Sequence, residues 1–372
     1  MQTDQIDPKA DLKILIAPLD WGLGHATRCI PVIRHLIQSN CKVVLAGEGA
    51  VAQLLKSNFP DLEILPLPGY RISYSNTASG FVPKILVQIP KIIRAIKAEK
   101  RWLKQIQTQH HFDLVISDNR YGLKIKRLPS VIMTHQLQIQ SGTGTLSDQM
   151  LKWLHYRILE KFDACWVVDN EGINNLGGSL SHPAEIPSNA KYIGLLSQLD
   201  QMSTANKSDQ KEILVLLSGP EPMRSILEQQ ILTQLKTATE YHFNLVAGNP
   251  TGSVPDKLPD HVTYYTHLNA EKINELMQKA SLVICRSGYS TLMDLVMMNK
   301  KALVIPTPGQ TEQEYLGKRL LDKGLLFCQN QTLLNLADDI PEALKFPGFK
   351  QIESQNNFRV VVNDVLNQLR IH

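Results

Sequence analysis

Short apolar segments alternate with amphipathic segments of helical length along most of this chain, and this alternation constrains the fold more than any other feature. Apolar runs of strand length cover residues 13–17, 42–46 and 62–66, and segments of helical length cover 25–39 and 50–57. Helices that separate successive strands return the chain to the same end of the sheet, so the strands pair in parallel. The sequence therefore predicts an α/β fold with a parallel sheet.

A polar stretch over residues 197–210 interrupts this alternation, which restarts with an apolar run at 212–217. The stretch has no apolar period and is typical of a linker, and 372 residues are more than one hydrophobic core usually serves. We predict two doubly wound, Rossmann-like domains at residues 1–196 and 211–354, which face each other across a cleft. Residues 355–372 have the apolar periodicity of a helix, and we hypothesise that this helix packs against the first domain.

The composition is that of a globular protein, with 43% hydrophobic and 20% charged residues. A net charge of +4 argues against a dedicated nucleic-acid binder and is compatible with anionic substrates or an anionic membrane surface. The five cysteines are widely spaced and form neither a metal-binding pair nor a disulfide framework, which fits a reducing cytoplasm. Residues 1–11 do not resemble a secretory signal, and no apolar run approaches the roughly 18 residues of a membrane-spanning helix. We expect a cytoplasmic protein, soluble or peripheral on the inner face of the membrane.

The first apolar strand leads into a turn that contains Gly22, Gly24 and His25. Glycines allow a sharp turn and a close approach of backbone to ligand, and free N–H groups at a helix start favour anions or polar substrates. The Gly-x-Gly pair is a weak dinucleotide motif, because Thr27 and Arg28 stand where a third glycine would be needed. His25 is placed to accept a proton, although an isolated histidine at a helix start is more often a cap.

A second strand–turn–helix segment, residues 282–294, has the pattern of an anion site. Free backbone N–H groups and hydroxyls at the start of its helix would act as donors toward a diphosphate. Gly288 permits close approach, the free N–H groups lie near Tyr289 and Ser290, and the hydroxyls belong to Ser287, Ser290 and Thr291. Asp294 lies one turn beyond Thr291, where its carboxylate would accept hydrogen bonds from ribose hydroxyls. A serine cap with an acidic first turn is an equally good interpretation.

A proline–glycine loop at residues 306–310 leads into a further helix whose first turn holds Glu312 and Gln313. Both side chains are positioned to bond hydroxyl groups of a ligand. A solvated helix start capped by Thr311 is the alternative, and for this segment taken alone it is preferred.

Together these motifs resemble the two-domain GT-B glycosyltransferases that use nucleotide sugars, and the likeness spans nearly the whole chain. Within that superfamily the sequence is most similar to the family 28 transferases that form the lipid-linked peptidoglycan precursor from UDP-GlcNAc, and more distantly to plant UDP-glycosyltransferases. Their acceptor-side Gly-x-Gly-His turn is matched by Gly22, Gly24 and His25. Their donor-side Arg-Ser-Gly-x-x-Thr-x-x-acid motif is matched by Arg286, Ser287, Gly288, Thr291 and Asp294.

The resemblance implies roles for further residues. It makes His25 the catalytic base and places Asp118, directly after the strand at residues 113–117, where relatives carry the carboxylate that orients the histidine. A turn-forming Asp-Asn pair is the alternative for Asp118. Glu312 and Gln313 match the acidic–Gln pair that holds the donor sugar in plant members, with Glu in place of the usual Asp.

Two departures from the family pattern limit the inference. The loop Ser218-Gly219-Pro220 stands where relatives carry more glycine and more backbone donors, and proline has no N–H. Gly219 would still line the donor site, and Arg224 would add a positive charge toward the diphosphate unless it is an ordinary surface arginine. His135, in Thr-His-Gln, stands on the acceptor side where the peptidoglycan enzymes carry His-Glu-Gln-Asn, so we expect a different acceptor.

Residues 84–106 form a basic amphipathic segment with Glu99 as its single acid. Its apolar positions recur near helical spacing, at Ile85, Ile89, Ile92, Ile93, Ile96, Leu103 and Ile106. A basic amphipathic helix can lie on anionic lipid. The favoured alternative is a crossover helix that is divided at Pro90 and whose apolar stripe packs on the sheet.

We predict an inverting, UDP-sugar-dependent hexosyltransferase in which His25, held by Asp118, deprotonates an acceptor hydroxyl. UDP-GlcNAc is a candidate donor and a lipid-linked or cell-envelope glycan a candidate acceptor, as the resemblance implies. No Asp-x-Asp cluster accompanies the expected phosphate site, so we expect neither a metal ion nor another cofactor. A UDP-sugar epimerase of the same fold and a non-catalytic nucleotide-sugar-binding protein are the alternatives. The sequence does not specify the sugar, the acceptor or the oligomeric state.

Overall fold

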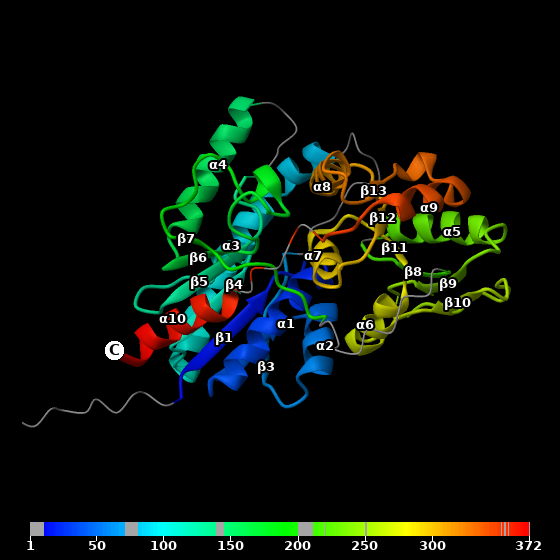
Figure 1. Cartoon of the computed structure of the whole chain (residues 1–372). Helices are drawn as coiled ribbons and strands as arrows, with labels where there is room; N and C mark the ends of the chain where they lie inside the picture. The colour runs from blue at the N-terminus through cyan, green and yellow to red at the C-terminus, as the bar shows by residue number, and fades with distance from the viewer. Residues whose placement is uncertain are drawn as a thin grey trace, which may run out of the picture. The chain divides into compact units, whose positions relative to one another are not determined.

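A computed structural model of the chain describes residues 11–70, 81–138, 145–199, 211–219, 221–249, 251–350, 352, 355 and 357–371, without the side chains of residues 81–89, 145–148 and 150. The chain divides into two compact units (Figure 1). Of these described residues, the first unit contains those within 1–73, 85–196 and 355–372, and the second contains those within 74–84 and 197–354. Most of the predicted linker, residues 200–210, and Pro220 of the predicted donor loop lie outside the described residues.

Within the described residues, the first unit is built on a sheet of seven parallel strands in the order β3-β2-β1-β4-β5-β6-β7. The strands are β1 (Lys13–Pro18), β2 (Lys42–Gly47), β3 (Ile64–Pro66), β4 (Leu114–Asp118), β5 (Ser130–Thr134), β6 (Ala164–Val167) and β7 (Ala190–Tyr192). Strands β4 and β5 are buried along their whole length. A strand that is covered on both faces has a continuous apolar sequence, and this explains the uniform apolar runs.

Helices follow the strands of this sheet. They are α1 (Leu23–Gln38), α2 (Gly49–Asn58), α3 (Phe81–His110), α4 (Thr145–Leu159) and, from the far end of the chain, α10 (Phe358–Ile371). Helix α10 packs beside α1 (Figure 1), where His35 Nε2 lies 2.8 Å from Asn363 Oδ1 and Arg370 donates to the carbonyl of Ser39 at 2.7 Å. The C-terminal helix is therefore part of the first unit. No helix in the described ranges is long and apolar enough to cross a membrane.

Helix α3 is continuous, and the prediction that Pro90 divides it is wrong. Proline removes one N–H donor from the helical ladder, but Pro90 is exposed and the helix continues past it. Leu103 and Ile106 near its C-terminal end are buried in a hydrophobic cluster with Leu15 and Val115 of the sheet. This end of the apolar stripe therefore covers the sheet, as the crossover interpretation predicted.

The second unit repeats the architecture with a sheet in the order β10-β9-β8-β11-β12-β13. The strands are β8 (Glu212–Leu216), β9 (His242–Val246), β10 (Val262–Tyr265), β11 (Leu282–Cys285), β12 (Ala302–Val304) and β13 (Phe327–Cys328). The helices are α5 (Met223–Leu235), α6 (Ala270–Lys279), α7 (Tyr289–Met297), α8 (Thr311–Asp322) and α9 (Leu336–Lys345). Its core joins Leu227 and Ile231 of α5 and Ile340 of α9 to Val215 and Ile284 of the sheet.

Each sheet has the doubly wound topology that the sequence predicted. The strand order reverses between β1 and β4 in the first unit and between β8 and β11 in the second. Ligands of such sheets bind beyond the carboxyl ends of the strands at this reversal. In each unit, the loops that leave these strands are therefore the first place to look for functional residues.

Candidate active site

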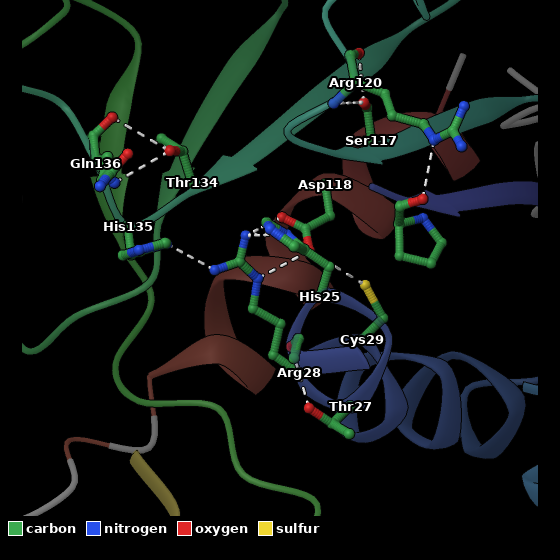
Figure 2. A network of polar contacts seen from close by, with 12 residues as sticks. His25, Thr27, Arg28, Cys29, Ser117, Asp118, Arg120, Thr134, His135 and Gln136 are labelled. Atoms are coloured by element: carbon green, nitrogen blue, oxygen red, sulfur yellow. Dashed lines mark hydrogen bonds and ion pairs between the residues drawn. The ribbon is translucent and has the colours of Figure 1, made fainter. Parts of the chain in front are cut away.

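In the first unit, three predicted site residues meet at the carboxyl ends of adjacent strands (Figure 2). His25 lies in the first turn of α1, which follows β1, and Asp118 is the last residue of β4. His135 directly follows β5. Parallel strands end at the same edge of a sheet, so the order β1-β4-β5 brings these side chains together.

His25 contacts Asp118 through one ring nitrogen. Its Nδ1 lies 3.1 Å from Asp118 Oδ2, and the side chain is 15% exposed whereas that of Asp118 is fully buried. Among the described residues, Nε2 of His25 has no hydrogen-bond partner. When Nδ1 donates its proton to Asp118, Nε2 carries the lone pair that can accept a proton. The pair thus has the arrangement of a carboxylate-oriented general base.

Arg28, which the sequence motifs left without a role, completes this network. Its Nε donates to Asp118 Oδ2 at 2.8 Å, and its NH2 group donates to Asp118 Oδ1. NH1 lies 2.7 Å from His135 Nδ1, and NH2 lies 2.9 Å from His25 Nδ1. A signal was present in the sequence, because residues three apart in a helix share a face and Arg28 is three residues after His25.

The charges in this cluster set the protonation of both partners. Burial by itself would raise the pKa of Asp118, but the positive charge of Arg28, followed by the contact with His25, lowers it to about 2. Burial and then the charge of Arg28 lower the pKa of His25, against the opposing effect of Asp118. Asp118 is therefore an anion and His25 a neutral imidazole near neutral pH, which is the protonation state that a base requires.

The two glycines of the first turn differ in backbone conformation. Gly22 precedes α1 with a φ of 122°, a conformation that side-chain-bearing residues rarely adopt, and no atom lies within 4 Å of the position that a Cβ would take. Gly24 lies inside the first helical turn, and its carbonyl accepts a hydrogen bond from the Thr27 hydroxyl at 3.0 Å.

In the second unit, the predicted anion motif lies at the carboxyl end of β11. Gly288 is the residue before α7, and an added Cβ there would meet no atom within 4 Å. Ser290 and Thr291 lie in the first turn of α7 and are half-buried. The hydroxyl of Ser287 is buried and donates to the carbonyl of Gln313 at 2.8 Å. Ser287 therefore ties this loop to α8, and Gly288 provides the open backbone.

Asp294 already accepts a hydrogen bond from a hydroxyl group. Ser197 Oγ donates to Asp294 Oδ1 at 2.5 Å, and the carboxyl is half-buried. Desolvation raises the pKa of Asp294 to about 7, although the hydrogen bond from Ser197 opposes this effect. The predicted ribose contacts would be of the same chemical kind as the contact that Ser197 makes.

The loop after β12 is ordered by its own side chains. Gln313 Oε1 accepts from the backbone N–H of Thr307 at 2.9 Å, and Gln313 Nε2 donates to Gln310 Oε1 at 2.5 Å. Glu314 accepts from the N–H of Gly309 at 2.8 Å. Gln313, which the sequence assigned to ligand hydroxyls, has protein partners here, and Glu312 beside it is half-buried.

Two further arginines of the second unit also bond within the protein. Arg224 is buried and pairs with Glu228 at 2.8 Å, with Glu221, and with the carbonyl of Ala247 at 2.9 Å. Its guanidinium is therefore not a surface group, and it has protein partners in this structure. Arg286 donates to the carbonyls of Ile305, Pro306 and Met223, and burial lowers its pKa to about 10.

Gly219, with a φ of 107°, has open space beside it. In the part of the chain that the structure describes, no three His, Cys, Asp or Glu side chains are arranged to hold a metal ion.

Similarity to known proteins defines the class. Residues 223–369 match the Glycosyltransferase family 28 C-terminal domain. The structure of CalG4, the calicheamicin glycosyltransferase, superposes with a TM-score of 0.66 at 13% identity and covers 96% of this chain and 98% of that chain. MurG of Acinetobacter baumannii superposes with a TM-score of 0.57 at 17% identity, over 96% and 99% of the two chains. The protein is a glycosyltransferase with the GT-B fold of two Rossmann-like domains.

Proteins related in sequence indicate which glycosyltransferases this chain resembles. The UDP-N-acetylglucosamine--N-acetylmuramyl-(pentapeptide) pyrophosphoryl-undecaprenol N-acetylglucosamine transferase of Clostridium botulinum is 21% identical over 355 residues, which are 92% of this chain and 90% of the relative. An uncharacterized glycosyltransferase of Methanosarcina acetivorans is 21% identical over 322 residues, or 82% of each chain. Within its class, the protein resembles the peptidoglycan N-acetylglucosamine transferases, as the motifs predicted.

Replacing Asp294 with Asn should stabilise the protein, and more at pH 8 than at pH 5. The raised pKa means that the native carboxyl holds a proton that the unfolded chain releases between about pH 4 and 7, so wild-type stability falls as the pH rises through this window. Asparagine has no charge to desolvate and keeps an oxygen that accepts from Ser197. The midpoint of thermal unfolding measures the effect, with the exposed Asp256→Asn as control. An equal change for Asp294→Asn at both pH values would contradict the prediction.

Proposed function

We propose that the protein is an inverting transferase that moves a sugar from a UDP-sugar to an acceptor hydroxyl, with His25 as the catalytic base. The observation that carries the proposal is the His25–Asp118 pair at the ends of β1 and β4, where His25 is neutral and its Nε2 is unpaired among the described residues. The resemblance to the peptidoglycan transferases supports UDP-GlcNAc as the donor and a lipid-linked or cell-envelope glycan as the acceptor.

The proposed reaction is a direct displacement. The acceptor oxygen attacks the anomeric carbon of the sugar as its proton passes to Nε2 of His25, and the bond from that carbon to the diphosphate breaks, which releases UDP. Attack opposite to the leaving group inverts the configuration. Asp118 stabilises the imidazolium that forms, and general-base assistance contributes typically 10²–10⁴-fold to the rate.

The second unit is assigned to the donor. The backbone N–H groups after Gly288 at the start of α7, together with the hydroxyls of Ser290 and Thr291, would stabilise the negative charge of the departing diphosphate. Asp294 would accept hydrogen bonds from ribose, and Glu312 would bond a hydroxyl of the sugar. Ser287, Gln313 and Arg224 each bond a backbone group of a loop or helix start, so we assign them to the order of these segments rather than to the donor.

His25→Asn should lower kcat by about 10²–10⁴-fold while UDP binding stays within about twofold of wild type. The asparagine amide can replace Nδ1 as donor to Asp118, but it offers no basic nitrogen. Transfer of label from UDP-GlcNAc to a bacterial lipid extract, together with calorimetric titration of UDP, measures both quantities. The matched control is His111→Asn, which changes an exposed histidine of the same unit.

Three outcomes would contradict this proposal. Loss of UDP affinity in His25→Asn would place the histidine in the donor site. Isomerisation of the UDP-sugar without an acceptor would identify an epimerase. UDP binding with no turnover of UDP-GlcNAc or of the TDP and GDP sugars would indicate a binding protein, and a thermal-shift screen of the same nucleotides identifies the base, because a ligand stabilises the state that binds it.

We expect transfer to proceed without a metal ion, because N–H and hydroxyl donors would take over the stabilisation of the diphosphate. Excess EDTA should therefore leave the initial rate of transfer unchanged. A rate that is lost in EDTA and restored by Mg²⁺ or Mn²⁺ would overturn this expectation.

We also propose that the outward face of α3 rests on anionic lipid at the cytoplasmic face of a membrane. Within residues 90–106 the only acid, Glu99, is buried, and Ile93 is 47% exposed among basic side chains. The exposed basic residues are Lys91, Arg94, Lys97, Lys100, Arg101 and Lys104. Such a face is attracted to anionic headgroups and is screened by salt.

The variant with Lys91, Arg94 and Lys97 changed to glutamine should co-sediment less with phosphatidylglycerol vesicles than the wild type does, and salt should weaken wild-type binding. The control changes the exposed Lys236, Lys257 and Lys279 to glutamine, which removes the same charge from the second unit. Equal loss in both triple variants, or no wild-type binding at low salt, would reject this surface.

A further inference from the structure

Arg28 holds a charged side chain in the buried interior of the first unit. The residue is 2% exposed, and its guanidinium faces Asp118 with two nitrogens at once, Nε toward Oδ2 and NH2 toward Oδ1. A bidentate contact of this kind fixes the plane of the carboxylate as well as its position. Asp118 thus cannot turn toward His25 independently of Arg28 (Figure 2).

The guanidinium also lies against the histidine that Asp118 orients. Arg28 NH2 is 2.9 Å from His25 Nδ1, while Asp118 Oδ2 is 3.1 Å from the same atom. If the imidazole of His25 gained a proton, its positive charge would therefore face that of the guanidinium at hydrogen-bond distance. The carboxylate favours that charge and the guanidinium opposes it, so the two effects partly offset each other in a poorly solvated site.

The other groups that face His25 add no compensating charge. From α1, Cys29 Sγ lies 3.9 Å from Asp118 Oδ2, and burial raises the pKa of this thiol so that it stays neutral. From the end of β5, His135 Nδ1 lies 2.7 Å from Arg28 NH1. This second imidazole also lowers the pKa of His25, as a smaller effect than that of Arg28.

We propose that Arg28 is a positioning residue of this site, which fixes Asp118 and offsets its charge so that His25 stays neutral and able to accept a proton in mildly acidic conditions. This inference rests on the proposed role of His25. It assigns opposite influences to two residues that touch the same imidazole: Asp118 orients the base and Arg28 limits its basicity. A residue with a merely structural role would not shift the titration of His25 in a defined direction.

The test is the NMR titration of His25 in the full-length protein. In wild type we expect a midpoint below the ordinary histidine value of about 6.5. Arg28→Gln should raise that midpoint by about one pH unit, and Asp118→Asn should lower it, because each removes one of the opposing charges. Arg28→Lys keeps the charge and should leave the midpoint close to that of wild type. Arg34→Gln, which changes an exposed arginine on the same helix, should have no effect.

The pH profile of transfer gives a second readout. The acidic limb of the kcat/KM profile should move to higher pH in Arg28→Gln. In Arg28→Lys the limb should stay in place, but the maximal kcat/KM should fall, because lysine cannot hold the carboxylate of Asp118 with two nitrogens. A His25 midpoint that is unchanged or lowered in Arg28→Gln would overturn the inference. If Arg28→Gln does not fold, a wild-type midpoint at or above 6.5, or a raised midpoint in Arg28→Lys, overturns it in the same way. The NMR result stands even if His25 proves not to be the base, so the two proposals fail separately.

Discussion

The parallel pairing of β1 with β4 is the constraint on which the candidate site depends. Its register sets Pro18, the last residue of β1, beside Asp118, the last residue of β4. The chain that leaves β1 turns at Gly22 and enters α1, so His25 returns over the end of β4 within one helical turn. A register slip of one residue would point Asp118 to the opposite face of the sheet. Backbone hydrogen bonds between apolar strands therefore fix the geometry of an acid–base pair.

The second sheet has the same doubly wound topology, and its strand ends carry a second set of loops. Arg286 and Ser287 direct their side chains into the protein, where they join the end of β11 to the loop after β12, to the start of α5 and to α8. This leaves the backbone at Gly288 open. The arginine and the serine of the motif hold the loops, and the glycine between the serine and α7 has open space beside it.

Local patterns predicted the two parallel sheets and the glycine and Ser-Gly turns at their strand ends, because strands, helices and turns depend on residues close in sequence. The network around the site depends on longer separations. Nothing local pairs Arg28 with Asp118, 90 residues later, or Ser197 with Asp294, 97 residues later. The strand order decides such contacts. Strand β13 has only two residues, too few for a pattern, and Pro341 inside α9 is a residue that argues against a helix in sequence reading.

The position of α10 has a consequence for how the protein is made. The helix that carries His25 is covered on its outer side by a segment separated from it by the entire second unit. During translation, residues of α1 emerge long before their partner exists, and the second unit can fold in the interval. The first unit is then completed last, although its sequence is synthesised first. Ribosome-bound intermediates of this protein would therefore carry α1 with an uncovered surface for most of the elongation time.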